Sequence, residues 1–227
     1  MAGGQWPRPR PRSVVRDRRL NRTTPRDSAL SALRRHGLLL ESDPRLPSVV
    51  SLVAGKPIGG SWWGHPSGAA IYRETNRLAD RSDVVVLKLL NGKVTFVLDT
   101  LWPHVYAVGS CGEPWQVSGM KQQSERLMDL VRRHGTIRTD DPRSRLAAGS
   151  RVSATALDLE RRLLVIGTQV HTETGRHAKA LESWSHWARR VSLASRVPLT
   201  RAKAELAEHV QRLNAEFNGA ARLPWAT

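Results

Sequence analysis

Two copies of one sequence pattern, 98 residues apart, constrain the fold of this chain more than any other feature. The pattern is Arg-Arg-His-Gly, five further residues and Asp-Pro-Arg, and it occupies residues 34–45 and again residues 132–143. An apolar helical pattern precedes each copy. The glycine is suited to end that helix, because it adopts left-handed backbone angles without a Cβ penalty. A short strand-like run and a turn follow, so the repeat predicts two copies of one helix–strand–helix unit.

The first copy continues in the order of a winged helix. Apolar spacing predicts a second helix that starts with Pro47 and a third helix over residues 67–80. Residues 84–90 and 93–98 are rich in β-branched and apolar side chains and predict two strands. Between them lies Asn91-Gly92, the preferred pair for a two-residue hairpin turn. Three helices followed by a hairpin indicate a winged-helix unit.

The second copy predicts a similar but less regular unit. Helical patterns cover residues 118–134 and 153–162, and residues 163–170 are a strand candidate. A further helix is expected over residues 176–190, and a final one begins after Pro198.

We therefore predict an α+β fold made of two tandem winged-helix-like units with a C-terminal helix. The expected boundaries are a disordered basic arm, two units, and a final helix with its tail, over residues 1–26, 27–117, 118–192 and 193–227. The arm alternates proline and arginine, a composition typical of disordered segments.

The charge of the chain predicts a polyanionic partner. The net charge is +16, and the first 26 residues, with eight arginines and one aspartate, supply +7 of it. The excess on the rest of the chain indicates binding of DNA, with RNA or an anionic membrane surface as the other polyanions of this class. Double-stranded DNA is the partner that the winged-helix order favours, and RNA is the second.

Cysteine content and hydropathy favour a soluble cytoplasmic protein. Cys111 is the only cysteine, which excludes an internal disulfide and a multi-cysteine zinc finger and is compatible with a reducing compartment. No apolar run approaches the roughly 20 residues that span a bilayer. We expect no membrane segment, no metal and no cofactor.

The third helix and the hairpin of the first unit carry the candidate DNA contacts. Arg73, Asn76 and Arg77 are expected on the solvent face of the helix, and these residue types read guanine and adenine edges in the major groove. Lys88 and Lys93 flank the predicted hairpin tip, where wing residues meet phosphates. An ordinary solvated helix face is the alternative for the helix residues.

Trp62 and Trp63 lie in a glycine-rich loop just before that helix. Two adjacent indoles are able to stack on a base drawn out of the duplex. The alternative is structural, with one of the two anchoring the loop in the core.

The densest polar cluster is the candidate catalytic site. If Gln169, His171 and Glu173 lie on a strand, their spacing of two places them on one face. A glutamine, a histidine and a carboxylate there can position and activate a water, with Glu173 as base or as the charge beside a positive sugar carbon. The alternative is a solvated hairpin. A zinc site using His171 and His177 lacks further ligands.

These residues give the chain a resemblance to the tandem winged-helix DNA glycosylases that remove alkylated or cross-linked bases. That family carries Gln-x-Gln or Gln-x-Asp on a strand that leads into a helix, and Gln169-Val170-His171 followed by Arg176 resembles it, as does the Trp62-Trp63 pair. His171 replaces the second Gln or Asp, so Glu173 would supply the carboxylate. The resemblance covers residues 28–190 in architecture and implies DNA contact by Arg176. Residues 60–102 also resemble a widespread uncharacterised bacterial family.

Three functions follow as hypotheses. The first is a DNA-binding protein that excises damaged or modified bases. The second is a non-catalytic DNA-binding regulator or architectural protein, which needs only the helix–hairpin unit and the charge. The third is an RNA- or ribosome-associated protein. Each predicts strongly salt-dependent binding, because every neutralised phosphate releases counterions.

Overall fold

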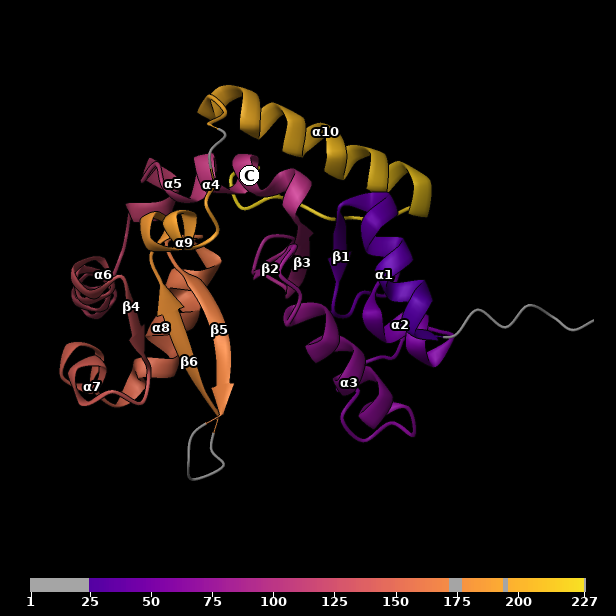
Figure 1. Cartoon of the computed structure of the whole chain (residues 1–227), viewed down its shortest axis with the longest axis horizontal. Coiled ribbons are helices and arrows are strands. Elements are labelled where there is room, and N and C mark those ends of the chain that lie inside the picture. Colours follow the sequence, from indigo (N-terminus) through magenta and orange to yellow (C-terminus); the bar gives the residue numbers. More distant parts are fainter. Residues whose placement is uncertain (1–24, 172–176, 194–195, 227) are drawn as a thin grey trace, which may run out of the picture.

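The computed structural model describes residues 25–171, 177–193 and 196–226, so the predicted basic arm lies almost entirely outside the described residues. The first unit, residues 25–98, follows the predicted order of helix, strand, two helices and hairpin (Figure 1). Its three strands form an antiparallel sheet in the order β1-β3-β2. Its elements are α1 (Pro25–His36), β1 (Leu38–Leu40), α2 (Val49–Ala54), α3 (Gly68–Ala79), β2 (Val84–Leu87) and β3 (Thr95–Leu98).

The second unit, residues 122–182, repeats this order of elements. Its antiparallel sheet has the order β4-β6-β5, which is the same order as in the first unit. The prediction of an α+β fold with two winged-helix-like units is therefore confirmed. The elements are α6 (Gln122–His134), β4 (Thr136–Arg138), α7 (Pro142–Ala148), η2 (Gly149–Arg151), α8 (Val152–Arg161), β5 (Ile166–His171) and β6 (His177–Glu182).

The repeated residues make the same backbone contacts in both units. Gly37 and Gly135 both have a positive φ, +66° and +74°, directly after the first helix of their unit. The carbonyl of Gly37 accepts a hydrogen bond from the amide of Leu98, and the carbonyl of Gly135 accepts one from Ser183, at 2.9 and 2.8 Å. The repeat thus joins the first helix of each unit to the end of its hairpin.

The repeated aspartates also share one role. The Oδ1 of Asp43 accepts a hydrogen bond from the amide of Arg45 at 3.0 Å, and the Oδ1 of Asp141 accepts one from Arg143 at 2.8 Å. In the second unit this bond caps α7, whose first residue is Pro142. Asp-Pro-Arg is therefore a turn motif at the approach to the second helix.

The two hairpins depart from the predicted bounds. The ladder of β2 and β3 ends at the pair Leu87 and Thr95, so both strands are shorter at the tip than the predicted residues 84–90 and 93–98. The predicted turn at Asn91-Gly92 does form, because both residues have a positive φ, +53° and +66°, and the amide of Lys93 donates to the carbonyl of Leu90 at 2.9 Å. In the second unit the predicted helix over residues 176–190 is wrong. Residues 177–182 form strand β6, because they pair with β5 and residues 180–182 also pair with β4, and the shorter helix α9 (Trp184–Arg190) follows.

The remaining helices connect and cover the two units. A 3-10 turn, η1 (Asp99–Leu101), leads into α4 (Trp102–Gly109) and α5 (Pro114–Val117), none of which the sequence pattern predicted. The predicted C-terminal helix is α10 (Leu199–Phe217), which crosses α4 and reaches the first unit (Figure 1). Its buried stripe includes Leu206, Val210 and Leu213. No helix in the described part of the chain has the length and apolar character needed to cross a bilayer.

Three apolar clusters hold the molecule together, one in each unit and one between them. The cluster between the units contains three indoles, with the ring of Trp187 5.1 Å from Trp102 and 5.5 Å from Trp184. Gly109 of α4 lies against the indole of Trp184, and a Cβ there would overlap it. These rings come from α4 and α9, and apolar residues of both units belong to the same cluster.

Candidate site: a charged cavity between the two units

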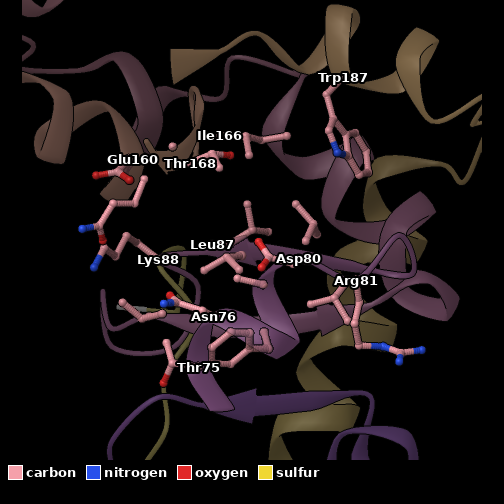
Figure 2. A pocket seen from close by; sticks show the side chains of 18 of the residues that line it. Thr75, Asn76, Asp80, Arg81, Leu87, Lys88, Glu160, Ile166, Thr168 and Trp187 are labelled. Atoms are coloured by element: carbon pink, nitrogen blue, oxygen red, sulfur yellow. The ribbon is translucent and has the colours of Figure 1, made fainter. Parts of the chain in front are cut away.

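A cavity of about 450 Å³ lies between the two units. On one side it is lined by α3, by β2 and by residues that follow these elements. On the other side it is lined by the end of α8, by β5 and by β6 (Figure 2). The third helix of one winged helix therefore shares a cavity with the hairpin of the other.

Two acids and two lysines gather at one end of this cavity. Glu160, on the last turn of α8, is only 6% exposed and is ion-paired with Lys179 of β6. Gly167 of β5 makes room for the Glu160 carboxylate, because a Cβ at this position would overlap it. Lys88 lies at the same end as Glu160 (Figure 2), and Glu41 lies just beyond β1.

Burial shifts the pKa values of the two groups from the first unit in this cluster. The pKa of Lys88 is lowered by burial, and the positive charges of Lys179 and Arg161 lower it further, while Glu160 and Glu41 act to raise it. The pKa of Glu41 is raised by burial against the opposing effect of Lys88. Within the described part of the chain, neither Lys88 nor Glu41 belongs to an ion pair closer than 4.0 Å.

The opposite end of the cavity holds Asp80, Arg81 and Trp187 (Figure 2). Arg81 is tied to Asp83 by two hydrogen bonds of 2.7 and 2.6 Å, which raise the pKa of the arginine and lower that of the aspartate. Arg81 at this end is therefore held in a fixed ion pair.

The predicted catalytic residues are only partly placed at the cavity. Gln169 is exposed on β5 and lines the cavity. His171 is the last residue of β5 and pairs with His177 on β6. Glu173 and Arg176 lie outside the described residues. The strand carrying Gln169 leads into a hairpin, so the expected strand-to-helix setting of this motif is wrong, because β6 occupies the place of the predicted helix.

The candidate reading helix, α3, shows three different environments. Arg73 is exposed, and Asn76 lines the cavity. The guanidinium of Arg77 donates two hydrogen bonds, of 2.8 and 2.7 Å, to Glu74, whose side chain is only 3% exposed. Of the three, Arg73 has the side chain that solvent reaches most fully.

The two tryptophans before α3 are divided between core and surface. Trp62 is buried in the core of the first unit, as the structural alternative predicts for one member of the pair. Trp63 is 65% exposed and stacks on Trp62 with ring centroids 4.4 Å apart, and Tyr72 lies 5.5 Å away. Trp63 is thus a supported, solvent-facing aromatic surface.

The tip of the first hairpin is held by the C-terminal tail. The amide of Asn91 donates to the carbonyl of Arg222 at 3.0 Å, and the Arg222 amide returns a bond to Asn91 Oδ1 at 2.9 Å. The ammonium of Lys93 is bound to Asp43 at 2.8 Å. Contact of Lys93 with a phosphate would compete with this ion pair. Lys88, the other predicted phosphate contact of this hairpin, lines the cavity between the units.

Sequence reasoning missed three residues of the cavity, Glu41, Glu160 and Lys179. They come from the end of β1, from α8 and from β6, and no spacing along the chain connects them. The one signal in the sequence is Gly167, whose missing side chain leaves room for the carboxylate of Glu160.

Comparison with family models, with curated proteins and with solved structures gives no match for this chain. The resemblance to tandem winged-helix glycosylases therefore stays a prediction from the residues.

Proposed function

We propose that the protein binds duplex DNA and excises a damaged or modified base that it draws into the cavity between its units. The observation that carries this proposal is the position of the cavity. It is shared by α3 of the first unit and the β5–β6 hairpin of the second, which are the elements that winged helices bring to DNA.

The cavity has the size and polarity of a site for one nucleotide. Its volume falls within the roughly 300–1,000 Å³ of pockets for small ligands. Asn76, Thr168 and Gln169 line it and offer hydrogen-bond donors and acceptors for a base edge. Enzymes that act on a base flip it out of the stack into such a pocket.

The charge of the chain supports binding to the DNA backbone. A net charge of +16 includes the arginine-rich first 26 residues, which would add phosphate contacts without reading sequence. Arg73 and Trp63, exposed on and before α3, would meet the duplex beside the cavity.

In the proposed reaction Gln169 orients a water toward the sugar carbon as the base leaves. Positive charge develops on the sugar in such a step, and a fixed carboxylate stabilises it. The sequence pattern assigns this role to Glu173. Glu160 is another candidate for it, because its carboxylate lines the cavity and is ion-paired with Lys179.

A cleavage assay on labelled duplexes tests the proposal. Duplexes carrying alkylated, deaminated or hypermodified bases are incubated with protein and treated with alkali, and binding gels are run on the same duplexes. Replacement of Gln169 by alanine is expected to slow excision by about 100-fold without loss of binding. Gln123→Ala, an exposed glutamine on α6, is the matched control and should have no effect.

The other outcomes decide between the remaining functions. Salt-dependent binding to duplexes without cleavage of any of them would favour a non-catalytic DNA-binding protein. Structured RNA that displaces duplex DNA from the protein would favour the RNA-binding hypothesis. Binding that barely changes with salt would contradict a nucleic-acid partner altogether.

A further inference from the structure

Lys88 is a cavity residue that the proposed excision step does not use. It follows β2 directly and lines the cavity between the units. It also lines a neighbouring cavity of about 480 Å³ that is formed by the loop of Gly59 and Gly60 and by Lys93. Lys88 therefore borders two cavities.

We propose that Lys88 forms a Schiff base with the aldehyde of an abasic deoxyribose and so cleaves the DNA strand at that sugar. This inference rests on the proposed binding of duplex DNA. It adds a second activity, a lyase reaction on abasic DNA, and it assigns a nucleophile that sequence analysis had placed among phosphate contacts.

Lys88 differs from the other lysines at these cavities in its partners. Lys179 is ion-paired with Glu160, and Lys93 is ion-paired with Asp43, so each of these ammonium groups already has a carboxylate partner. No carboxylate of the described residues lies within 4.0 Å of Lys88. Of these three lysines, Lys88 is the one whose amine is not already bound to a carboxylate of the described residues.

The surroundings of Lys88 favour the neutral amine that attacks a carbonyl. Burial disfavours the charged form and lowers the pKa of Lys88, and Lys179 and Arg161 act in the same direction. Glu160 and Glu41 oppose them. Desolvation and a neighbouring cation are the two general means by which proteins activate a lysine for Schiff-base chemistry.

Glu41 is suited to the proton transfer that follows. It lines the same cavity and is near enough to Lys88 for each charge to affect the pKa of the other. Burial raises the pKa of Glu41, and this makes its carboxylate a stronger base than an exposed glutamate.

The reaction balances without an external oxidant or reductant. The neutral amine of Lys88 adds to the C1′ aldehyde of the ring-opened sugar, and loss of water gives the imine. Glu41 then takes a proton from C2′, the C3′–O bond breaks, and the 3′ phosphate leaves as the end of the second DNA fragment. Water hydrolyses the imine, which releases an unsaturated aldehyde and restores the lysine.

Borohydride trapping on a labelled duplex with one abasic site tests the inference. Borohydride reduces an imine to a stable amine, so the full-length protein is expected to become covalently linked to the labelled strand. Lys88→Arg, which keeps the positive charge, is expected to lower the yield of linked product by about 100-fold. Lys121→Arg, at an exposed lysine just before α6, is the matched control and should keep the wild-type yield.

Binding gels on the same abasic duplex separate the two proposals. Normal binding without a covalent product overturns the lyase inference alone, and so does a product that Lys88→Arg leaves unchanged. Failure of the wild-type protein to bind the duplex overturns the proposed function and this inference with it. Loss of the product in Lys88→Arg, with binding retained, supports both.

Discussion

The two copies of the Arg-Arg-His-Gly repeat share one backbone arrangement but differ in what covers them. In the first unit His36 is only 9% exposed, because α10 lies over it, with the Phe217 ring edge-on at 5.3 Å and His209 against the His36 carbonyl. In the second unit His134 is exposed to solvent. The glycine and the aspartate act within their own unit in both copies, whereas the environment of the histidine is decided by a distant helix.

The largest effect is expected where α10 attaches. Leu206 is fully buried against the cluster between the units, so Leu206→Ala should lower the free energy of unfolding by about 2–5 kcal/mol. Denaturant unfolding measures the change, and Glu208→Ala, exposed on the same helix, should stay within about 0.5 kcal/mol of wild type. If Leu206→Ala lowered the free energy of unfolding no more than Glu208→Ala, the packing of α10 would contribute little to stability.

The two repeated glycines test the part of the comparison in which the copies agree. Because both have a positive φ, Gly37→Ala and Gly135→Ala should each lower the free energy of unfolding by about 1–2 kcal/mol. The second substitution should cost more, since its Cβ would lie 2.6 Å from the His186 ring, against 3.0 Å from Leu101 in the first. Gly59→Ala, which has open space and no positive φ, serves as the control. Equal stability of all three variants would refute the argument.

The histidines test the part in which the copies differ. His36→Ala removes a buried ring and its edge contact with Phe217, so we expect a loss of about 1 kcal/mol in the free energy of unfolding. His134→Ala is expected to change it by no more than about 0.5 kcal/mol. Equal losses of unfolding free energy in the two variants would mean that the cover of α10 over His36 does not make this histidine more important for stability than His134.

The smallest effect is a difference in pH dependence. Burial lowers the pKa of His36 below its ordinary value of 6.5, and Arg35 and His209 lower it further against Glu216. A histidine of this kind takes up a proton in the unfolded chain before it does so in the folded one, so stability falls as the pH drops below 6.5. Unfolding midpoints measured across this range should fall less in His36→Gln than in wild type. His134→Gln should follow the wild-type curve, and a flat wild-type curve would exclude His36 as a contributor.

Sequence patterns predicted the features of the fold that depend on neighbouring residues. The positive φ of both repeat glycines, the order of elements in the first unit and the bounds of α3 all follow from local chemistry. Strand β6 was missed because Ala178, Lys179 and Leu181 are good helix formers, while their pairing partner β4 lies about 40 residues earlier.

The cavity was beyond sequence reasoning for the same kind of reason. Gln169 and Asn76 were singled out by residue type, and both line the cavity. Glu160 looks like an ordinary solvent-facing charge near the end of a helix, and only the packing of α8 on β5 buries it. Lys88 was assigned to an exposed hairpin tip, because nothing local to it indicates that the second unit packs alongside.

The bonds between Asn91 and Arg222 join the tip of the first hairpin to a segment that follows the second unit in the chain. As the chain leaves the ribosome, the first hairpin emerges more than a hundred residues before the segment that holds its tip, a delay on the order of ten seconds at usual rates of synthesis. Until then His36 and the neighbouring apolar surface stay uncovered. The first unit therefore completes its tertiary contacts only after residues 199–222 have been synthesised.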